Sequence, residues 1–128
     1  MKTILSLTLL ALAVVSLIPP PAMADSYRQI SMQEAIELMN SESDYIILDV
    51  RTPQEYQSGH IPDAICIPNE TILHDDIPEL PDKDQLILVY CRSGNRSKQA
   101  SSKLAALGYT NIAEFGGIHA WPGEIVIP

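Results

Sequence analysis

The stretch LILVYCRSGNRSKQA, residues 86–100, decides the fold. Its first five residues are apolar, as in a strand that is buried on both faces of a sheet. A Ser-Gly-Asn turn follows closely on Cys91. From Ser97 the apolar residues recur at helical spacing until Gly108 provides a stop. A buried strand that passes through a tight turn into a helix predicts an α/β fold.

Strands and helices also alternate along the rest of the chain. Capping-box spacing predicts two further helices, one from Ser31 with Glu34 and one from Thr52 with Glu55. Residues 74–84 predict a loop with one helical turn. Strands are predicted at residues 45–50, 64–68, 86–90 and 111–115. This alternation predicts a mostly parallel sheet with helices on both faces.

The N-terminal stretch predicts a secretory signal peptide at residues 1–24. Lys2 is followed by residues 4–18 without a charge, and an Ala-x-Ala pattern ends at Ala24. The apolar run is shorter than the roughly 20 residues of a membrane span. An uncleaved anchor is the alternative. We expect cleavage after Ala24, which leaves residues 25–128 as one secreted domain, without attachment to the membrane.

The composition excludes some partners and leaves a question about the cysteines. The 128 residues include 16 acidic and 8 basic ones, a net charge of −8. Such an acidic chain is not expected to bind nucleic acid or an anionic membrane. Cys66 and Cys91 could form a disulfide in a secreted domain. The domain is long enough to fold without one, and Cys66 lies in an apolar strand, as a small hydrophobic residue would.

Cys91 is the candidate reactive residue. It lies where a strand ends, and ligands of α/β sheets bind at that edge. The start of the following helix favours an anion, and Arg92 and Arg96 add two positive charges. Gly94 and Asn95 tolerate positive φ angles, so the loop can direct its amides inward. These features favour the reactive thiolate; the alternative is a buried, inert cysteine that closes a strand.

The length of the loop separates two chemistries. Four residues lie between Cys91 and Arg96, whereas cysteine phosphatases need a loop one residue longer to surround a phosphate. The tighter loop suits a single extra sulfur atom on the cysteine better than a tetrahedral phosphate. A phosphatase or arsenate reductase on the same fold is therefore the less favoured hypothesis.

Three stretches resemble the signature stretches of single-domain rhodaneses, the thiosulfate:cyanide sulfurtransferases. They are LDVRTPQEYQSGHIPDAICIP (48–68), VYCRSGNRS (89–97) and FGGIHAWPG (115–123), in the expected order. With the signal peptide, the layout resembles that of small periplasmic rhodaneses of the phage-shock-protein-E type. The resemblance implies a rhodanese-like α/β fold with a mostly parallel five-stranded sheet. The sequence gives no reason to expect a metal or an organic cofactor.

The resemblance also implies a two-step sulfur transfer. The Cys91 thiolate attacks the outer sulfur of thiosulfate, sulfite leaves, and a persulfide remains for transfer to cyanide or a thiol. Arg92 and Arg96 would orient thiosulfate, and backbone amides of the loop would stabilise the charge on sulfur. The implied binding residues are Arg92, Ser93, Gly94, Asn95, Arg96 and Ser97. We expect a monomeric enzyme; the alternative is a rhodanese module that carries sulfur or binds a partner without catalysis.

Three further residues are expected to support the site. Asp49 ends a strand and should bind the backbone or an arginine, and Arg51 should form an ion pair with an acid. His60 is expected to be a hydrogen-bonded turn residue rather than a base or a metal ligand. His119 should lie near the rim of the site, and Trp121 in the core.

Overall fold

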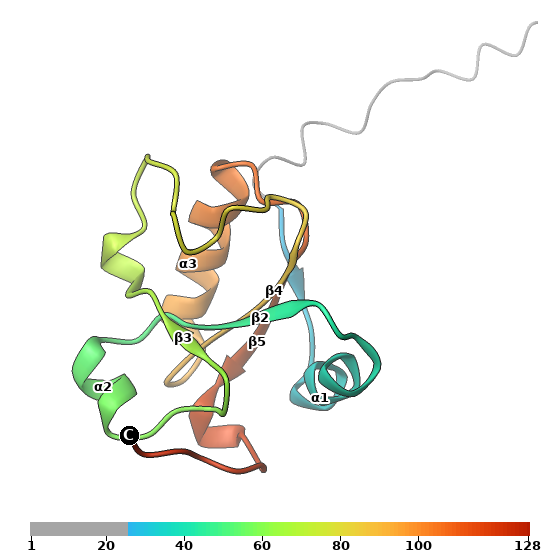
Figure 1. Ribbon diagram of the computed structural model, residues 1–128, viewed down its shortest axis with the longest axis vertical. Helices are drawn as coiled ribbons and strands as arrows, with labels where there is room; N and C mark the ends of the chain where they lie inside the picture. The colour runs from blue at the N-terminus through green and yellow to red at the C-terminus, as the bar shows by residue number, and fades with distance from the viewer. Residues whose placement is uncertain (1–25) are drawn as a thin grey trace, which may run out of the picture.

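A computed structural model describes residues 26–128, and the predicted signal peptide lies outside the described residues. A five-stranded parallel sheet has the order β1-β5-β4-β2-β3 and carries helices on both faces (Figure 1). The strands are β1 (Arg28–Gln29), β2 (Tyr45–Asp49), β3 (Ile65–Cys66), β4 (Leu86–Cys91) and β5 (Ile112–Gly117). The helices are α1 (Met32–Ser41), α2 (Pro53–Gln57) and α3 (Asn95–Ala106), with 3₁₀ turns η2 (Asn69–Thr71) and η3 (Ile118–Ala120). The predicted fold class is confirmed.

Both predicted capping boxes are present. At the start of α1, the Ser31 hydroxyl accepts from Glu34 N at 3.0 Å, and Glu34 Oε1 accepts from Ser31 N at 3.2 Å. Thr52 and Glu55 make the same reciprocal pair at the start of α2. Each box satisfies backbone N–H groups that lack a partner inside the helix. These local bonds fix where α1 and α2 begin.

The central strand β4 is buried along its whole length and separates two apolar clusters. Ile87, Val89 and Cys91 pack in the cluster that includes α3. Leu88 and Tyr90 pack in the cluster that includes α1. This alternation is the pleat of a strand that is covered on both faces. It places Cys91 on the face of the sheet that α3 covers.

Several local predictions were wrong, among them the strand at 64–68, of which only Ile65–Cys66 is a strand. The helix α3 begins at Asn95 rather than Ser97, because Gly94 adopts a left-handed φ of 110° and turns the chain early. No helical turn forms within residues 74–84; a 3₁₀ turn forms instead at Asn69–Thr71, after β3. The predicted strand at 111–115 continues to Gly117.

The edge strand β1 had no signal in the sequence. Its two residues are exposed and carry no apolar pattern, so pairing with β5 alone defines it. Between residues 26 and 128, no helix has the length and apolar character that crossing a membrane requires.

Candidate active site

Cys91 lies at the carboxyl end of β4, directly before the loop that enters α3. Its side chain is buried, with 1% of the residue exposed. The backbone N–H of Gly94 donates to the Cys91 sulfur at 3.0 Å. Gly94 reaches this position through its positive φ of 110°, which glycine adopts without the steric penalty of other residues. The loop therefore directs a backbone donor at the sulfur, as an anion site requires.

The end of β5 closes the loop from one side. Gly117 pairs with Cys91 across the sheet, after an irregularity in the register between β4 and β5. A Cβ atom at Gly117 would collide with the carbonyl oxygen of Arg92 and with Ser93 Cα. A glycine at this position is therefore required for the strand and the cysteine loop to approach this closely.

Ser97 and Glu114 lie behind the cysteine. The S–H of Cys91 donates to Ser97 Oγ at 3.4 Å, and the Ser97 hydroxyl donates to Glu114 Oε2 at 2.6 Å. Gly116 N donates to the same Glu114 oxygen at 2.7 Å. Glu114 is 3% exposed. The sequence analysis did not single out this residue, although an acid in the middle of a buried strand was a visible signal.

The two arginines of the loop have protein partners. Arg96 binds both carboxylate oxygens of Glu55, at 2.6 and 2.9 Å. The hydrogen bond from Arg96 lowers the pKa of Glu55 to about 2. Arg92 is exposed, and its Nε donates to Nε2 of His119 at 3.0 Å. A role for both arginines in binding the substrate stays a prediction. Glu55, which the sequence indicated only as a capping residue, is an additional residue of the site because it binds Arg96.

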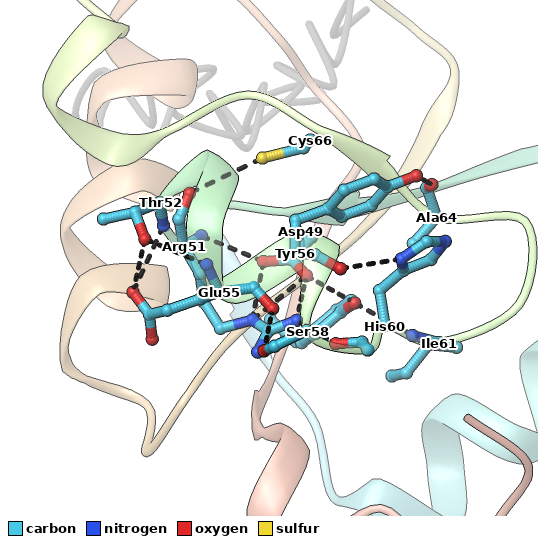
Figure 2. A network of polar contacts seen from close by, with 12 residues as sticks. Asp49, Arg51, Thr52, Glu55, Tyr56, Ser58, His60, Ile61, Ala64 and Cys66 are labelled. Carbon is cyan, nitrogen blue, oxygen red and sulfur yellow. Dashed lines mark hydrogen bonds and ion pairs between the residues drawn. The ribbon is translucent and has the colours of Figure 1, made fainter. Parts of the chain in front are cut away.

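A buried ion pair supports the adjacent strand end (Figure 2). Arg51 Nη2 donates to Asp49 Oδ2 at 2.7 Å and to the carbonyl oxygen of Gly59 at 2.8 Å. The Tyr90 hydroxyl donates to the same Asp49 oxygen at 2.7 Å, and it accepts from Ile61 N at 3.1 Å. The predicted ion pair of Arg51 is confirmed, and Asp49 is the acid. The network ties β2 and β4 to the chain that follows α2.

His60 has the structural place that the sequence indicated. Its ring stacks on Tyr56, with ring centroids 3.7 Å apart, and its Nδ1 lies 3.0 Å from the Tyr56 carbonyl oxygen. The His60 backbone pairs with Val126 in both directions. Across residues 26–128, no cluster of three or more His, Cys, Asp or Glu side chains could hold a metal ion.

The two cysteines are both free. Cys66 is half-buried, and its sulfur donates to the Arg51 carbonyl oxygen at 3.6 Å (Figure 2). Burial, together with the negative charge of Asp49, raises the pKa of Cys66 to about 11. The structure thus gives no support to a disulfide between Cys66 and Cys91. The two thiols have different surroundings, and the loop donor reaches Cys91 alone.

Comparison with known proteins assigns this arrangement to a family. Residues 31–124 match the model of the rhodanese-like domain, a range that includes strands β2 to β5, the cysteine loop and α3. The chain belongs to the rhodanese family. The predicted resemblance is confirmed.

Named relatives of this rhodanese are sulfurtransferases. Thiosulfate sulfurtransferase PspE of Escherichia coli is 38% identical over 71 residues, which are 56% of this chain and 68% of that protein. Thiosulfate sulfurtransferase GlpE of Pseudoalteromonas translucida is 34% identical over 97 residues, 75% of this chain and 90% of that protein. The rhodanese described here is a sulfurtransferase.

Solved rhodanese structures have the same fold. A rhodanese with anions from E. coli superposes with a TM-score of 0.60 at 33% identity, covering 66% of this chain and 99% of that one. A rhodanese-related protein from Thermoplasma volcanium gives a TM-score of 0.66 at 30% identity and covers 80% of this chain and all of that one. The parallel sheet and its helices are therefore those of a rhodanese.

Proposed function

We propose that this rhodanese transfers the outer sulfur of thiosulfate to a thiophilic acceptor through a persulfide on Cys91. One observation carries the proposal: the Cys91 sulfur lies at the end of β4, buried, and accepts the Gly94 N–H at 3.0 Å. A sulfur atom added to Cys91 would lie in the same loop, at the start of α3. Two relatives are named as thiosulfate sulfurtransferases.

In the first step, the Cys91 thiolate attacks the outer sulfur of thiosulfate. A sulfur–sulfur bond forms to Cys91, the sulfur–sulfur bond of thiosulfate breaks, and sulfite leaves with the bonding electron pair. The product is a persulfide whose outer sulfur carries the negative charge. In this proposal the N–H of Gly94, which donates to the Cys91 sulfur, and the positive end of α3 stabilise that charge, as preorganised donors do in an oxyanion hole.

In the second step, an acceptor takes the sulfur. A nucleophile such as cyanide in an assay, or a thiol in the cell, attacks the outer sulfur of the persulfide. The bond between the two sulfur atoms breaks, and Cys91 leaves as a thiolate. This returns the enzyme to its starting state, so the same donor at Gly94 serves both half-reactions.

Arg92 and Arg96 orient the sulfite group of thiosulfate in this proposal. A guanidinium has five N–H donors, and Arg96 uses Nη1 and Nη2 on Glu55. Donors remain on Arg96 for a substrate oxygen. Arg92 is exposed at the entrance to the loop, where it meets His119. Both arginines can thus contact an anion without leaving their protein partners.

The enzyme acts, in this proposal, as a monomer in the periplasm, after cleavage of residues 1–24. The support is the N-terminal pattern of one basic residue, an apolar run and an Ala-x-Ala site. A reactive thiol in an oxidising compartment is at risk of oxidation. The burial of Cys91 limits that risk.

Steady-state kinetics test the proposal. The wild type should form thiocyanate from thiosulfate and cyanide, with parallel lines in double-reciprocal plots, because sulfite leaves before cyanide reacts. Cys91→Ser should abolish turnover, whereas the control Cys66→Ser should keep it. Turnover by Cys91→Ser, or intersecting lines that require both substrates at once, would contradict the persulfide route.

A further inference from the structure

Glu114 is a buried carboxylate that takes no part in the two sulfur-transfer steps of the proposed reaction. It lies in β5, is 3% exposed, and contacts α3 through Ser97. The residues in register with it on the neighbouring strands are Gln29 and Val89, both uncharged. A buried carboxylate without an opposite charge is costly unless donors compensate it. Its donors here are the Ser97 hydroxyl and Gly116 N.

The hydrogen bonds between Cys91 and Glu114 have a direction. A serine hydroxyl has one proton, and Glu114 Oε2 is the nearest acceptor, at 2.6 Å against 3.0 Å for the Gly94 carbonyl oxygen. Because the Ser97 hydroxyl donates its one proton to Glu114, the Ser97 oxygen is free to accept a hydrogen bond from the thiol of Cys91 at 3.4 Å. The three side chains form one chain, from S–H through O–H to a carboxylate.

We propose that Glu114 receives the proton of Cys91 through Ser97. The S–H bond breaks as its proton moves to Ser97 Oγ, and the original hydroxyl proton of Ser97 moves to Glu114 Oε2. The products are a thiolate and a neutral carboxylic acid, so no charge is created. The role of this proton transfer in turnover rests on the proposed function, because the transfer produces the thiolate that attacks thiosulfate.

Electrostatics favour this transfer over loss of the proton to solvent. A thiolate formed beside an ionised Glu114 would place two negative charges in one buried site, and the low local dielectric strengthens their repulsion. Transfer along the chain keeps a single negative charge. It also turns the Ser97 hydroxyl towards the sulfur, so the thiolate gains a second donor besides Gly94 N.

Other charged groups on the surrounding elements do not compete for this proton. Two acids among them are paired with arginines: Glu55 of α2 with Arg96 of α3, and Asp49 of β2 with Arg51. Three other basic side chains have other partners: Arg92 contacts His119 of η3, Lys103 of α3 contacts Asn69, and Arg28 of β1 contacts Asn111. Lys98 of α3 is exposed. Glu114 is thus the acid that the contacts join to Cys91 through one hydroxyl.

The test measures how the reactivity of Cys91 depends on pH. Alkylation by iodoacetamide, a neutral reagent, is followed at the Cys91 peptide by mass spectrometry, together with the rate of sulfur uptake from thiosulfate. Glu114→Gln removes the carboxylate that takes the proton, and Ser97→Ala removes the hydroxyl that links Cys91 to Glu114. The matched control is Ser101→Ala, one turn further along α3, where the buried hydroxyl has no hydrogen-bond partner among the described residues.

We expect both Glu114→Gln and Ser97→Ala to alkylate at least about tenfold more slowly than the wild type near neutral pH. The rates should converge with the wild type at strongly alkaline pH, where hydroxide removes the proton directly. Ser101→Ala should follow the wild type at every pH. A thermal unfolding curve checks that each variant is folded. If Glu114→Gln does not fold, the result for Ser97→Ala decides the test.

Other results would overturn the proposal. An equal loss at all pH values would mean that Glu114 only supports the loop. An unchanged or faster rate near neutral pH would mean that Glu114 merely opposes the thiolate. Alkylation measures only whether Cys91 has lost its proton, and does not depend on sulfur transfer. If alkylation shows the expected pH profile but the wild type takes no sulfur from thiosulfate, the proposed function is refuted and the proton transfer stands.

Discussion

Arg96 and Glu55 form a pair at the flank of the cysteine loop, with two hydrogen bonds of 2.6 and 2.9 Å. Glu55 is held in place twice, because its Oε1 also accepts from the backbone N and the hydroxyl of Thr52. Both charged side chains are partly exposed, so the pair adds a modest free energy of folding. Its main effect is to fix the guanidinium beside the loop.

The pair gives a pH-dependent stability. The pKa of Glu55 is lowered to about 2 by Arg96, so its contribution is complete above the carboxyl's ordinary pKa and is lost as the pH falls through about 2. Glu55→Gln should lower the free energy of unfolding by about 1 kcal/mol near neutral pH. Urea unfolding should show this difference shrinking as the pH drops below about 4. A difference independent of pH would contradict the ion pair.

Cys66 should be the slower thiol. Because burial and Asp49 raise its pKa to about 11, it remains protonated, and therefore weakly nucleophilic, up to strongly alkaline pH. Peptide mapping after iodoacetamide treatment should find Cys66 unmodified near pH 8 and modified only as the pH approaches about 11. Rapid modification of Cys66 at neutral pH would contradict this assignment.

At the scale of elements, the site is one turn between β4 and α3, closed by the end of β5. The position of Cys91 could be predicted from sequence, because an apolar run, a cysteine and a glycine-containing turn are all local. The pairing of Arg96 with Glu55 and that of Ser97 with Glu114 could not be predicted, because each contact joins distant segments, although Glu114 was visible as an acid in a buried strand. The start of α3 was misplaced because the helix begins at Asn95, directly after the left-handed turn at Gly94, before the apolar spacing from which the helix was predicted starts.

Gly117→Ala should damage the loop. A Cβ there collides with the backbone of Arg92 and Ser93, and backbone cannot move aside as a flexible side chain can. We expect a loss of about 2 kcal/mol or more in the free energy of unfolding, together with loss of sulfur transfer. Thermal unfolding and the thiocyanate assay measure the two effects.

Gly108→Ala is the matched control for this substitution. Gly108 also has a positive φ, of 96°, but a Cβ there has no neighbour within 4 Å. It should lose about 1 kcal/mol and keep its activity. If the two variants lost equal activity, the close approach of β5 to the cysteine loop would not be what matters.

At the scale of the whole molecule, the Asp49 network joins segments far apart in the chain. Asp49 in β2 binds Tyr90 in β4 and Arg51, which reaches Gly59 beyond α2. The resemblance to rhodaneses led us to expect an ion pair for Arg51. The sequence gave no sign of Tyr90 or Gly59 as partners. The Tyr90 contact exists only once β2 and β4 pair, and the Gly59 contact only once α2 has brought the chain back towards Arg51.

Breaking this network should destabilise the whole domain. Asp49 is fully buried and Arg51 is 5% exposed, so Asp49→Ala leaves a buried cation without its acid. The expected loss in the free energy of unfolding is about 3–5 kcal/mol. Asp76→Ala, which removes an exposed pair with Lys83, should cost well under 1 kcal/mol. Urea unfolding compares the two; similar losses would contradict a central role for Asp49.

The central claim is that Cys91 carries a sulfur atom between two substrates. Intact-mass spectrometry before and after addition of thiosulfate tests it most directly, with Cys91→Ser beside the wild type. We predict that the wild type gains the mass of one sulfur atom and returns to its starting mass when cyanide is added, while Cys91→Ser shows neither change. A wild type that gains no sulfur with Cys91 free and reduced, or a Cys91→Ser variant that gains it, would contradict the account.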